Sequence, residues 1–286
     1  MKVDNRKISI AIPTYNSSEF ILNALSYIID DERVNEIIIS DDHSNDYRKL
    51  ISKIKDISPK IKIFRNKHNL GGFGNKYQAI SKCKNKRAIL LDSDNSLTEN
   101  YIDKLFEISK WNSEIIYCPD FAKPNFNYKK FSGMVINKEL TRKILIDQKG
   151  SNFGIFLNTG NYFVDIQNYI KCIRGKENVK VHSGDVISFI SLWLQNNYSL
   201  YIVPGLEYNH RIHKKSYSVN TSGRGERIIR DNLKAIINNR EYKFKYKRNV
   251  LYEKLENIFF KYFDQNKLLQ YIYPILSNTI LREKSD

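Results

Sequence analysis

Short apolar runs alternate with longer amphipathic segments over the first 120 residues of the chain. The apolar runs have the length of buried strands and stand at 8–12, 36–40, 61–65, 88–91 and 114–118. Between them, apolar residues recur at helical spacing and predict helices at 20–29, 50–57, 74–83 and 98–108. Ser17 or Ser18 is available to cap the first helix, and Thr98 the last. This alternation predicts an α/β fold, with a mainly parallel sheet covered by helices on both faces.

The segments that directly follow three of the predicted strands are polar. They read PTYN at 13–16, DDHS at 41–44 and DSDN at 92–95. Ligands of such sheets bind at the carboxyl ends of the strands, so these segments are the first candidates for a site. Acidic residues gathered at one rim repel each other unless a cation or hydrogen-bond donors hold them. A metal site and a nucleotide pocket would explain both acidic pairs.

Glycine-rich nucleotide motifs are missing from the first strand-to-helix turn. Neither GxxxxGK[ST] nor GxGxxG follows the first strand, which argues against a P-loop NTPase and against a classical dinucleotide fold. The glycine-rich sequence NLGGFGNK, residues 69–76, instead follows the third strand.

The composition is that of a globular protein. Hydrophobic residues make up 41% and charged residues 27%, with only 12 Gly and 6 Pro, which excludes collagen-like and disordered classes. No apolar run approaches the ~20 residues of a membrane span, and the apolar stretch before Pro13 is too short for a signal peptide. The three cysteines form no CxxC pair and are expected to be buried, reduced thiols. We therefore expect a soluble or peripheral intracellular protein.

Positive charge is concentrated in the second part of the chain. The formal net charge is +16, but residues 1–120 carry 19 basic against 17 acidic residues, and residues 121–286 carry 28 against 14. Basic residues gather most densely within 201–250. Such a cluster favours phosphates or anionic lipid. No RNA- or DNA-binding motif accompanies it, so nucleic acid is not an expected partner.

Four segments together resemble one enzyme family. ISIAIPTYNSSEFILNAL, EIIISDDHSND, NLGGFGNKYQAI and AILLDSDN, in this order and spacing, resemble the inverting glycosyltransferase family 2, of GT-A fold. The resemblance is clear over about residues 7–110, looser through 218 and absent beyond. It implies a nucleotide-sugar-binding half at 1–120, an acceptor-binding half of the same domain at 121–222, and a basic helical C-terminal extension at 223–286.

The resemblance assigns the acidic pairs to a sugar nucleotide. Asp94 is the implied ligand of Mn²⁺ or Mg²⁺, and Asp92 is the ribose contact or a second metal ligand, with Ser93 between them. Asp41 is the implied acceptor for the uracil imide, so UDP is the expected carrier. Asp42 belongs to the same pair, but a turn or N-cap role is an equal alternative. For the DSDN segment the alternative is a solvated turn.

Further residues are implied to line the base pocket. The Pro13 backbone, Thr14 and the Tyr15 ring follow the first strand, and the ring would stack on the base. Packing is the alternative for Tyr15. The glycine-rich segment adds three residues to the border of the pocket: Asn69, Gly71 and Lys76.

The second part is expected to supply a base and an acceptor site. Asp185 stands at a predicted helix start, where the family places its catalytic base, although an ordinary helix cap is the alternative. Arg211 and His213 match an R-x-H-x-x-S segment; His213 would complete the metal shell and Arg211 would neutralise phosphate, unless the segment is a basic surface loop. The sequence NTGN, residues 158–161, is a candidate border of the acceptor site.

The tail at 225–286 combines basic residues with aromatic and apolar ones. It resembles an amphipathic segment for which two interpretations stay open. It lies on an anionic membrane, where polyprenyl-linked acceptors are found, or it packs on the catalytic domain or on a second subunit, which allows an oligomer.

The combined prediction is a metal-dependent inverting glycosyltransferase. It would move a hexosyl or N-acetylhexosaminyl group from a nucleotide sugar, in the first place a UDP-sugar, to a hydroxyl of a saccharide or lipid-linked saccharide. Bacterial surface glycan assembly is the expected setting, in the cytoplasm or on the inner face of its membrane. The alternative is a catalytically silent GT-A-fold protein that binds the nucleotide and recruits partners through its basic tail.

Overall fold

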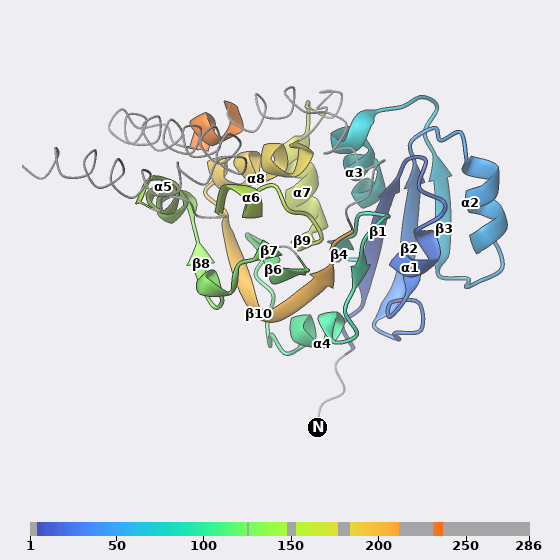
Figure 1. Ribbon diagram of the computed structural model, residues 1–286, viewed down its shortest axis with the longest axis horizontal. Helices are drawn as coiled ribbons and strands as arrows, with labels where there is room; N and C mark the ends of the chain where they lie inside the picture. Colours follow the sequence, from blue (N-terminus) through green and yellow to red (C-terminus); the bar gives the residue numbers. More distant parts are fainter. Residues whose placement is uncertain (1–4, 125, 148–152, 177–183, 212–230, 237–286) are drawn as a thin grey trace, which may run out of the picture.

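The computed structural model describes residues 5–124, 126–147, 153–176, 184–211 and 231–236. Within them, a central sheet runs through the molecule and helices cover both of its faces (Figure 1). His213 and most of the basic extension predicted for 223–286 lie outside the described residues. None of the helices in these ranges has the length and apolar character needed to cross a membrane.

The first half of the sheet is parallel, as predicted. Four strands follow each other in the order β3-β2-β1-β4. Their bounds are β1 (Ile8–Thr14), β2 (Val34–Asp41), β3 (Ile61–Arg65) and β4 (Arg87–Leu90). Because all four run in one direction, their carboxyl ends lie along one edge.

The second half of the sheet is mixed. The order continues β9-β6-β10-β5, and β7 and β8 pair with β6 and β10. The bounds are β5 (Ser96–Leu97), β6 (Ile115–Lys123), β7 (Phe126–Asn127), β8 (Val135–Ile136), β9 (Phe163–Asp165) and β10 (Ser199–Asn209). β9 pairs antiparallel with both β4 and β6 and thereby joins the two halves. Since β6 crosses position 120, the predicted halves share one continuous sheet.

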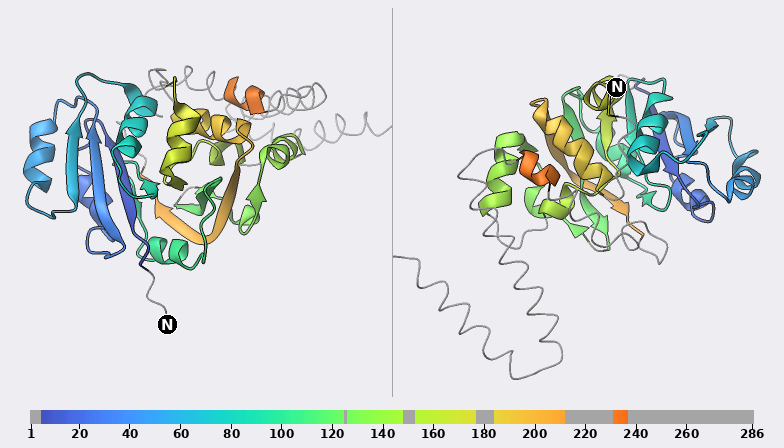
Figure 2. Two further views of the ribbon diagram at one scale, coloured as in Figure 1. Left: turned by 180° about the vertical axis from the view of Figure 1, so that it is seen from behind. Right: turned by 90° about the horizontal axis from the view of Figure 1, so that it is seen from above.

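The helices form two layers (Figure 1). One layer contains α1 (Ile21–Leu25), α2 (Tyr47–Ile54) and α4 (Tyr101–Phe106). The other contains α3 (Gly71–Ser81), the 3₁₀ turn η1 (Lys129–Phe131), α5 (Lys138–Asp147), α6 (Phe153–Phe156), α7 (Ile166–Ile173) and α8 (Asp185–Gln195). Figure 2 shows α2, in blue, at one end of the molecule and the green α5 at the other.

The strands supply both hydrophobic cores through the two-residue period of extended chain. In and just after β4, Ala88 and Leu90 pack toward α3, α7 and α8, whereas Ile89 and Leu91 pack toward α1 and α4. Each of these side chains is almost completely buried. This burial on both faces explains why the predicted strands read as continuous apolar runs rather than as alternating ones.

The predicted helix caps are wrong. α1 begins after Phe20 and α4 after Asn100, and neither cap residue forms a side-chain cap hydrogen bond. The Ser17 hydroxyl is used elsewhere, as described below, and the Thr98 hydroxyl donates to the Glu207 carbonyl at 2.6 Å. Tertiary partners therefore take the hydroxyls that local capping would have used.

The described part of the extension, a short helix at 231–236, packs on the domain. Leu233 and Ile236 are buried in the core beneath α5 and α8. The Asn232 amide donates to the Ser188 hydroxyl on α8 at 3.0 Å, and Arg142 Nε on α5 donates to the Ile236 carbonyl at 2.7 Å. This part of the extension belongs to the hydrophobic core. The cysteines are free thiols; Cys118 and Cys172 are buried and Cys83 is half-buried.

Candidate active site

Three segments far apart in the sequence meet at the carboxyl edge of the parallel strands. Thr14, the last residue of β1, pairs in register with Asp41, the last residue of β2. On the other side of β1, the Leu91 N–H donates to the Ala11 carbonyl at 2.9 Å and brings the DSDN segment alongside. The predicted segments 13–16, 41–44 and 92–95 therefore share one edge of the sheet.

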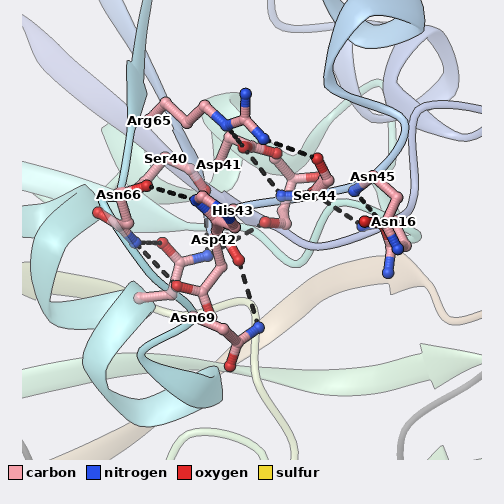
Figure 3. A network of polar contacts seen from close by, with 12 residues as sticks. Asn16, Ser40, Asp41, Asp42, His43, Ser44, Asn45, Arg65, Asn66 and Asn69 are labelled. Atoms are coloured by element: carbon pink, nitrogen blue, oxygen red, sulfur yellow. Dashed lines mark hydrogen bonds and ion pairs between the residues drawn. The ribbon is translucent and has the colours of Figure 1, made fainter.

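Asp41 is fully buried, and only one of its carboxylate oxygens has protein partners. Oδ2 lies 3.3 Å from Arg65 Nε and accepts from the Ser44 N–H at 3.1 Å (Figure 3). Oδ1 has no hydrogen-bond partner among the described residues. The Arg65 guanidinium also stacks over the Tyr47 ring at 4.4 Å. A buried acceptor without a partner is costly, so Oδ1 is suited to receive a ligand N–H.

Asp42 supplies the cap of α3 from outside the helix. Its Oδ1 accepts from the Leu70 N–H at 2.8 Å and its Oδ2 from the Gly71 N–H at 2.9 Å. The Asn66 amide adds a third hydrogen bond to Oδ1 at 2.9 Å (Figure 3). A carboxylate at a helix N-terminus satisfies N–H groups that have no partner within the helix and complements the helix dipole. Asp42 therefore makes the hydrogen bonds expected of a helix-capping residue, which was the alternative to its role in binding the nucleotide.

Removing the Asp42 carboxylate should destabilise the fold. For Asp42→Ala we expect the free energy of unfolding to fall by about 2 kcal/mol, because partly buried N–H groups at the start of α3 lose their acceptor. Urea denaturation followed by circular dichroism measures this loss. Asp56→Ala is the matched control, since the Asp56 side chain is exposed and forms a surface ion pair with Lys55 at 3.7 Å. Equal stability of the two variants would contradict the capping role.

Asn75 on α3 holds two strand ends together. Its amide donates to the Ser40 carbonyl at 3.0 Å and to the Thr14 carbonyl at 3.3 Å. Its oxygen accepts from Asn66 at 3.1 Å. The residue is almost completely buried. Its hydrogen bonds fix the position of α3, which also carries Lys76, relative to the ends of β1 and β2.

The glycine-rich segment starts α3 next to this cluster. Asn69 is exposed; its amide donates to the Asp42 carbonyl at 3.2 Å, and its oxygen accepts from the Gly71 N–H at 3.1 Å. Gly71 has φ 78°, a left-handed conformation that favours glycine. His43, on the facing loop, adopts φ 63° as well.

Hydroxyl groups connect the first loop to the DSDN segment. Ser17 Oγ lies 3.0 Å from Thr14 Oγ1 and 2.8 Å from Ser93 Oγ. Thr14 and Ser93 are buried, and Pro13 is buried within β1. The Tyr15 ring is 48% exposed, so its face is available for stacking on a ligand.

Lys76 joins two acidic residues that the sequence analysis assigned to different roles. Lys76 Nζ lies 2.9 Å from Asp92 Oδ1 and 2.6 Å from Asp185 Oδ2. The three residues come from α3, from the loop after β4 and from the start of α8. Burial disfavours the charged ammonium, but the Asp185 and Asp92 carboxylates outweigh it and raise the pKa of Lys76 above its ordinary value. Lys76 is therefore a fixed positive charge between two negative ones.

The loop before β9 positions Asp92. The Asn161 side-chain oxygen accepts from the Asp92 N–H at 2.8 Å, and the Asn161 carbonyl accepts from the buried Tyr101 hydroxyl at 2.6 Å. Gly160 gives the carboxylate room, since a Cβ at this position would lie 2.8 Å from Asp92 Oδ2. The NTGN segment thus contacts the DSDN loop; its predicted place at the acceptor stays a prediction.

Asp185 opens α8, as the sequence predicted. Gly184 precedes it with φ 80°, a left-handed turn that suits glycine. The Asp185 side chain is 22% exposed. Its Oδ2 is held by Lys76, and Oδ1 makes no hydrogen bond or ion pair with a described residue. One oxygen of the predicted base is thus held and the other is open to a ligand.

Asp94 and Arg211 lie at the ends of the same region. Asp94 is half-buried in the DSDN loop. Arg211 is exposed; its N–H donates to the Asn95 side chain at 3.0 Å, and its guanidinium lies 5.0 Å from the centre of the Phe20 ring. Burial lowers the pKa of the adjacent His210 below its ordinary value, against the opposing charge of Asp92.

The oxygen ligands near the DSDN loop could contribute to a divalent-cation site. Within the described ranges, no three His, Cys, Asp or Glu side chains form a group that could hold a metal ion. Two carboxylates, Asp92 and Asp94, share the DSDN loop, and Asp92 also binds Lys76. Mg²⁺ is commonly held by one or two protein carboxylates together with substrate phosphates, and Mn²⁺ accepts similar oxygen ligands. The residues therefore fit a cation whose coordination a bound diphosphate completes.

Several site residues were missed from the sequence. Arg65 contacts Asp41, Asn66 donates to Asp42, and the buried Asn75 accepts from Asn66. Arg65 ends a predicted strand, so the strand-end rule that selected Asp41 would have selected it too. Asn75 stands in the glycine-rich segment that was already singled out. No local signal marks Ser17 as a link between two loops, because that contact depends on the packing of β1 beside β4.

Comparison with known proteins identifies the family. A sequence model described as glycosyl transferase family 2 matches residues 9–165, more than half of the chain. The chain belongs to glycosyl transferase family 2. The matched region begins in β1 and ends in β9, so it includes the acidic loops after β2 and β4 and the glycine-rich segment.

A curated member of this kind of enzyme shares part of the sequence. Over 112 residues the chain is 28% identical to poly(ribitol-phosphate) beta-N-acetylglucosaminyltransferase TarP of Staphylococcus aureus (strain N315). The aligned part covers 38% of this chain and 34% of TarP. The chain therefore spans about a third of this relative.

Solved structures confirm the GT-A fold. Staphylococcus aureus TarS 1-349 in complex with UDP-GlcNAc superimposes with a TM-score of 0.56 at 13% identity, over 75% of this chain and 61% of TarS. GalNAc-T7 with UDP, GalNAc and Mn²⁺ gives 0.55 at 17% identity, over 72% of this chain and 44% of GalNAc-T7. At these identities the likeness concerns the fold alone.

Proposed function

We propose that this member of glycosyl transferase family 2 is an inverting transferase of N-acetylglucosamine from UDP-N-acetylglucosamine. The acceptor would be a hydroxyl group of a bacterial surface polymer or of a lipid-linked saccharide. Support for the sugar and the polymer comes from the name of TarP, a poly(ribitol-phosphate) beta-N-acetylglucosaminyltransferase, and from the UDP-GlcNAc complex of TarS.

The observation that carries this proposal is the meeting of Asp92 and Asp185 at Lys76. The predicted donor carboxylate and the predicted base come from opposite halves of the domain, yet both lie within hydrogen-bond distance of one ammonium. An inverting displacement needs its base close to the bound donor, on the side opposite the leaving group, and fold stability alone does not require partly buried acids to gather there.

Asp41 is proposed to read the base. Its unpartnered Oδ1 would accept from the ring N–H of uracil, a donor that neutral cytosine lacks. Arg65 and Ser44 hold the other oxygen and so fix the direction of the carboxylate. The exposed Tyr15 ring would stack on the base, beside Pro13 and Thr14.

The proposed chemistry is a single displacement. The acceptor hydroxyl attacks the anomeric carbon, Asp185 takes its proton, and the bond from that carbon to the diphosphate oxygen breaks with inversion. Asp94, with Asp92 and His213, would hold a divalent cation, which supplies charge neutralisation of the departing diphosphate. Arg211 would contact a phosphate, and Asn69 and Gly71 would border the nucleotide.

A donor screen tests the proposal without knowledge of the acceptor. The full chain is incubated with single UDP- and GDP-sugars in Mn²⁺ or Mg²⁺, and released nucleotide is measured, because slow attack by water reports the donor. We expect release from UDP-N-acetylglucosamine above that from the other donors. UDP binding in calorimetry with no release from any donor, and none on adding polyol-phosphate polymer, would instead support the catalytically silent alternative.

Gly160→Ala should impair turnover by displacing Asp92. The new methyl group would stand 2.8 Å from Asp92 Oδ2, closer than van der Waals contact allows, so the carboxylate must shift from the position in which its other oxygen contacts Lys76. We expect donor turnover to fall by about tenfold, the equivalent of one charge-assisted hydrogen bond. The control is Gly154→Ala, where an added Cβ meets nothing within 4 Å. Equal turnover of the two variants would count against a role for Asp92.

Three statements from the sequence stay predictions beside this proposal. They are the cytoplasmic location, the contact of the basic tail with an anionic membrane, and an oligomer formed through the C-terminal helices. The residues that carry the last two lie mainly outside the described ranges.

A further inference from the structure

Lys76 is almost completely buried and is paired with two carboxylates, whereas a lysine that binds phosphate needs an ammonium open to the ligand. Its side chain is 9% exposed, and both of its ion pairs are made to carboxylates of the proposed site. Burial, together with the nearby Asp185 and Asp92 carboxylates, raises the pKa of the buried Tyr162 and Tyr169 hydroxyls above its ordinary value. Little of the ammonium is left to face a diphosphate.

The α3 surface is shaped to hold Asp185. Gly72 and Lys76 are four residues apart and therefore lie on one face of the helix. Lys76 Nζ lies 2.6 Å from Asp185 Oδ2, and a Cβ on Gly72 would stand 3.2 Å from the same oxygen. Lys76 thus supplies a positive partner for Asp185 Oδ2, and the missing side chain of Gly72 leaves room for this oxygen beside the helix. Oδ1, which has no partner among the described residues, is left to face a reacting hydroxyl.

We propose that Lys76 is a positioning residue that fixes the rotamer of Asp185 and ties it to the donor loop through Asp92. This inference rests on the proposed function, in which Asp185 is the base. It replaces the expectation that Lys76 borders the nucleotide pocket as a ligand. Because one ammonium serves both carboxylates, the base is held against the loop that receives the donor, and a free Asp185 side chain would sample other rotamers.

The experiment is a double-mutant cycle on the full chain. Lys76→Met removes the charge at similar length, Lys76→Arg keeps it, and Asp185→Asn removes the base. Donor affinity is measured by calorimetry with UDP-N-acetylglucosamine, and kcat and KM by UDP release. Lys82→Met is the control, because Lys82 is exposed at the other end of α3. Thermal unfolding checks that each variant is folded.

For Lys76→Met we expect kcat to fall by about 10- to 100-fold while donor affinity changes by less than about threefold. Lys76→Arg should recover much of the loss, and adding Lys76→Met to Asp185→Asn should lower kcat no further, since Lys76 acts through Asp185. Weakened donor binding with kcat retained would overturn the inference and make Lys76 a donor ligand. Additive losses in the cycle would overturn it as well.

The wild-type chain separates this inference from the function on which it rests. No turnover by the wild type with any donor or polymer acceptor overturns the proposed function, and the positioning of a base falls with it. Turnover by the wild type with an unchanged kcat in Lys76→Met overturns only the role of Lys76. In Lys82→Met both parameters should equal those of the wild type.

Discussion

Asp185→Asn should reduce transfer by about 10²- to 10⁴-fold, the range typical of removing a general base. The substitution keeps the size of the side chain and the oxygen that Lys76 contacts, but an amide does not take a proton from the acceptor hydroxyl. The loss should therefore appear in kcat, and UDP binding should stay near the wild-type value because Asp185 is proposed to act on the acceptor hydroxyl and not to contact the nucleotide. Steady-state kinetics and calorimetry with UDP measure the two quantities.

Glu139→Gln is the matched control for Asp185→Asn. Glu139 is also an acidic residue in the first turn of a helix, α5, but it is exposed and pairs with Arg142 at 3.0 Å. A merely capping Asp185 would behave like Glu139, with a small change in stability and normal turnover. Near-normal turnover of Asp185→Asn would therefore assign Asp185 to the helix cap and remove the base from the proposed mechanism.

Asp94→Asn should abolish the dependence of turnover on a divalent cation, together with most of the turnover itself. We expect a fall of about 10³-fold, because a bound cation contributes several kcal/mol of charge stabilisation in such reactions. The direct measurement is binding of Mn²⁺ in the presence of UDP, followed by electron paramagnetic resonance. The spectrum of bound Mn²⁺ should be lost in Asp94→Asn, whatever the activity of the protein.

Glu99→Gln controls for the loss of one negative charge near the same loop. Glu99 is exposed just beyond β5, five residues from Asp94. It should leave both Mn²⁺ binding and turnover unchanged. If Asp94→Asn binds Mn²⁺ as the wild type does, the cation is held elsewhere, and Asp94 is a loop residue of the solvated-turn type.

The predictions for Asp92, Asp185 and Lys76 depend on one arrangement, in which the Lys76 ammonium forms ion pairs with both carboxylates. Removing either acid leaves Lys76 with one partner, whereas removing Lys76 leaves two partly buried carboxylates beside each other without a counter-charge, which is the more costly change. The stability of Lys76→Met is thus expected to fall more than that of Asp185→Asn. This difference is the reason for measuring unfolding beside turnover in every variant.

Much of the fold, and the positions of several candidate site residues, could be predicted from the sequence alone. Continuous apolar runs are buried on both faces of a sheet, and polar residues that follow such runs must lie at its edge, so β1 to β4 and the positions of Asp41, Asp92 and Asp94 could be predicted. The place of Asp185 at the start of a helix that leads into a strand was predicted from the resemblance to the family, and its role as the base stays a prediction.

Only the tertiary structure decided how these residues are partnered. β9 has three residues, too few for a periodic signal, yet its antiparallel pairing joins the two halves and brings Asn161 to Asp92. The Ser17 hydroxyl does not cap α1 but lies 2.8 Å from the Ser93 hydroxyl. The Asp42 carboxylate caps α3, which starts 29 residues later in the sequence. The meeting of Asp92, Lys76 and Asp185 has no local signature. Contacts between distant segments depend on packing and burial, which local periodicity does not encode.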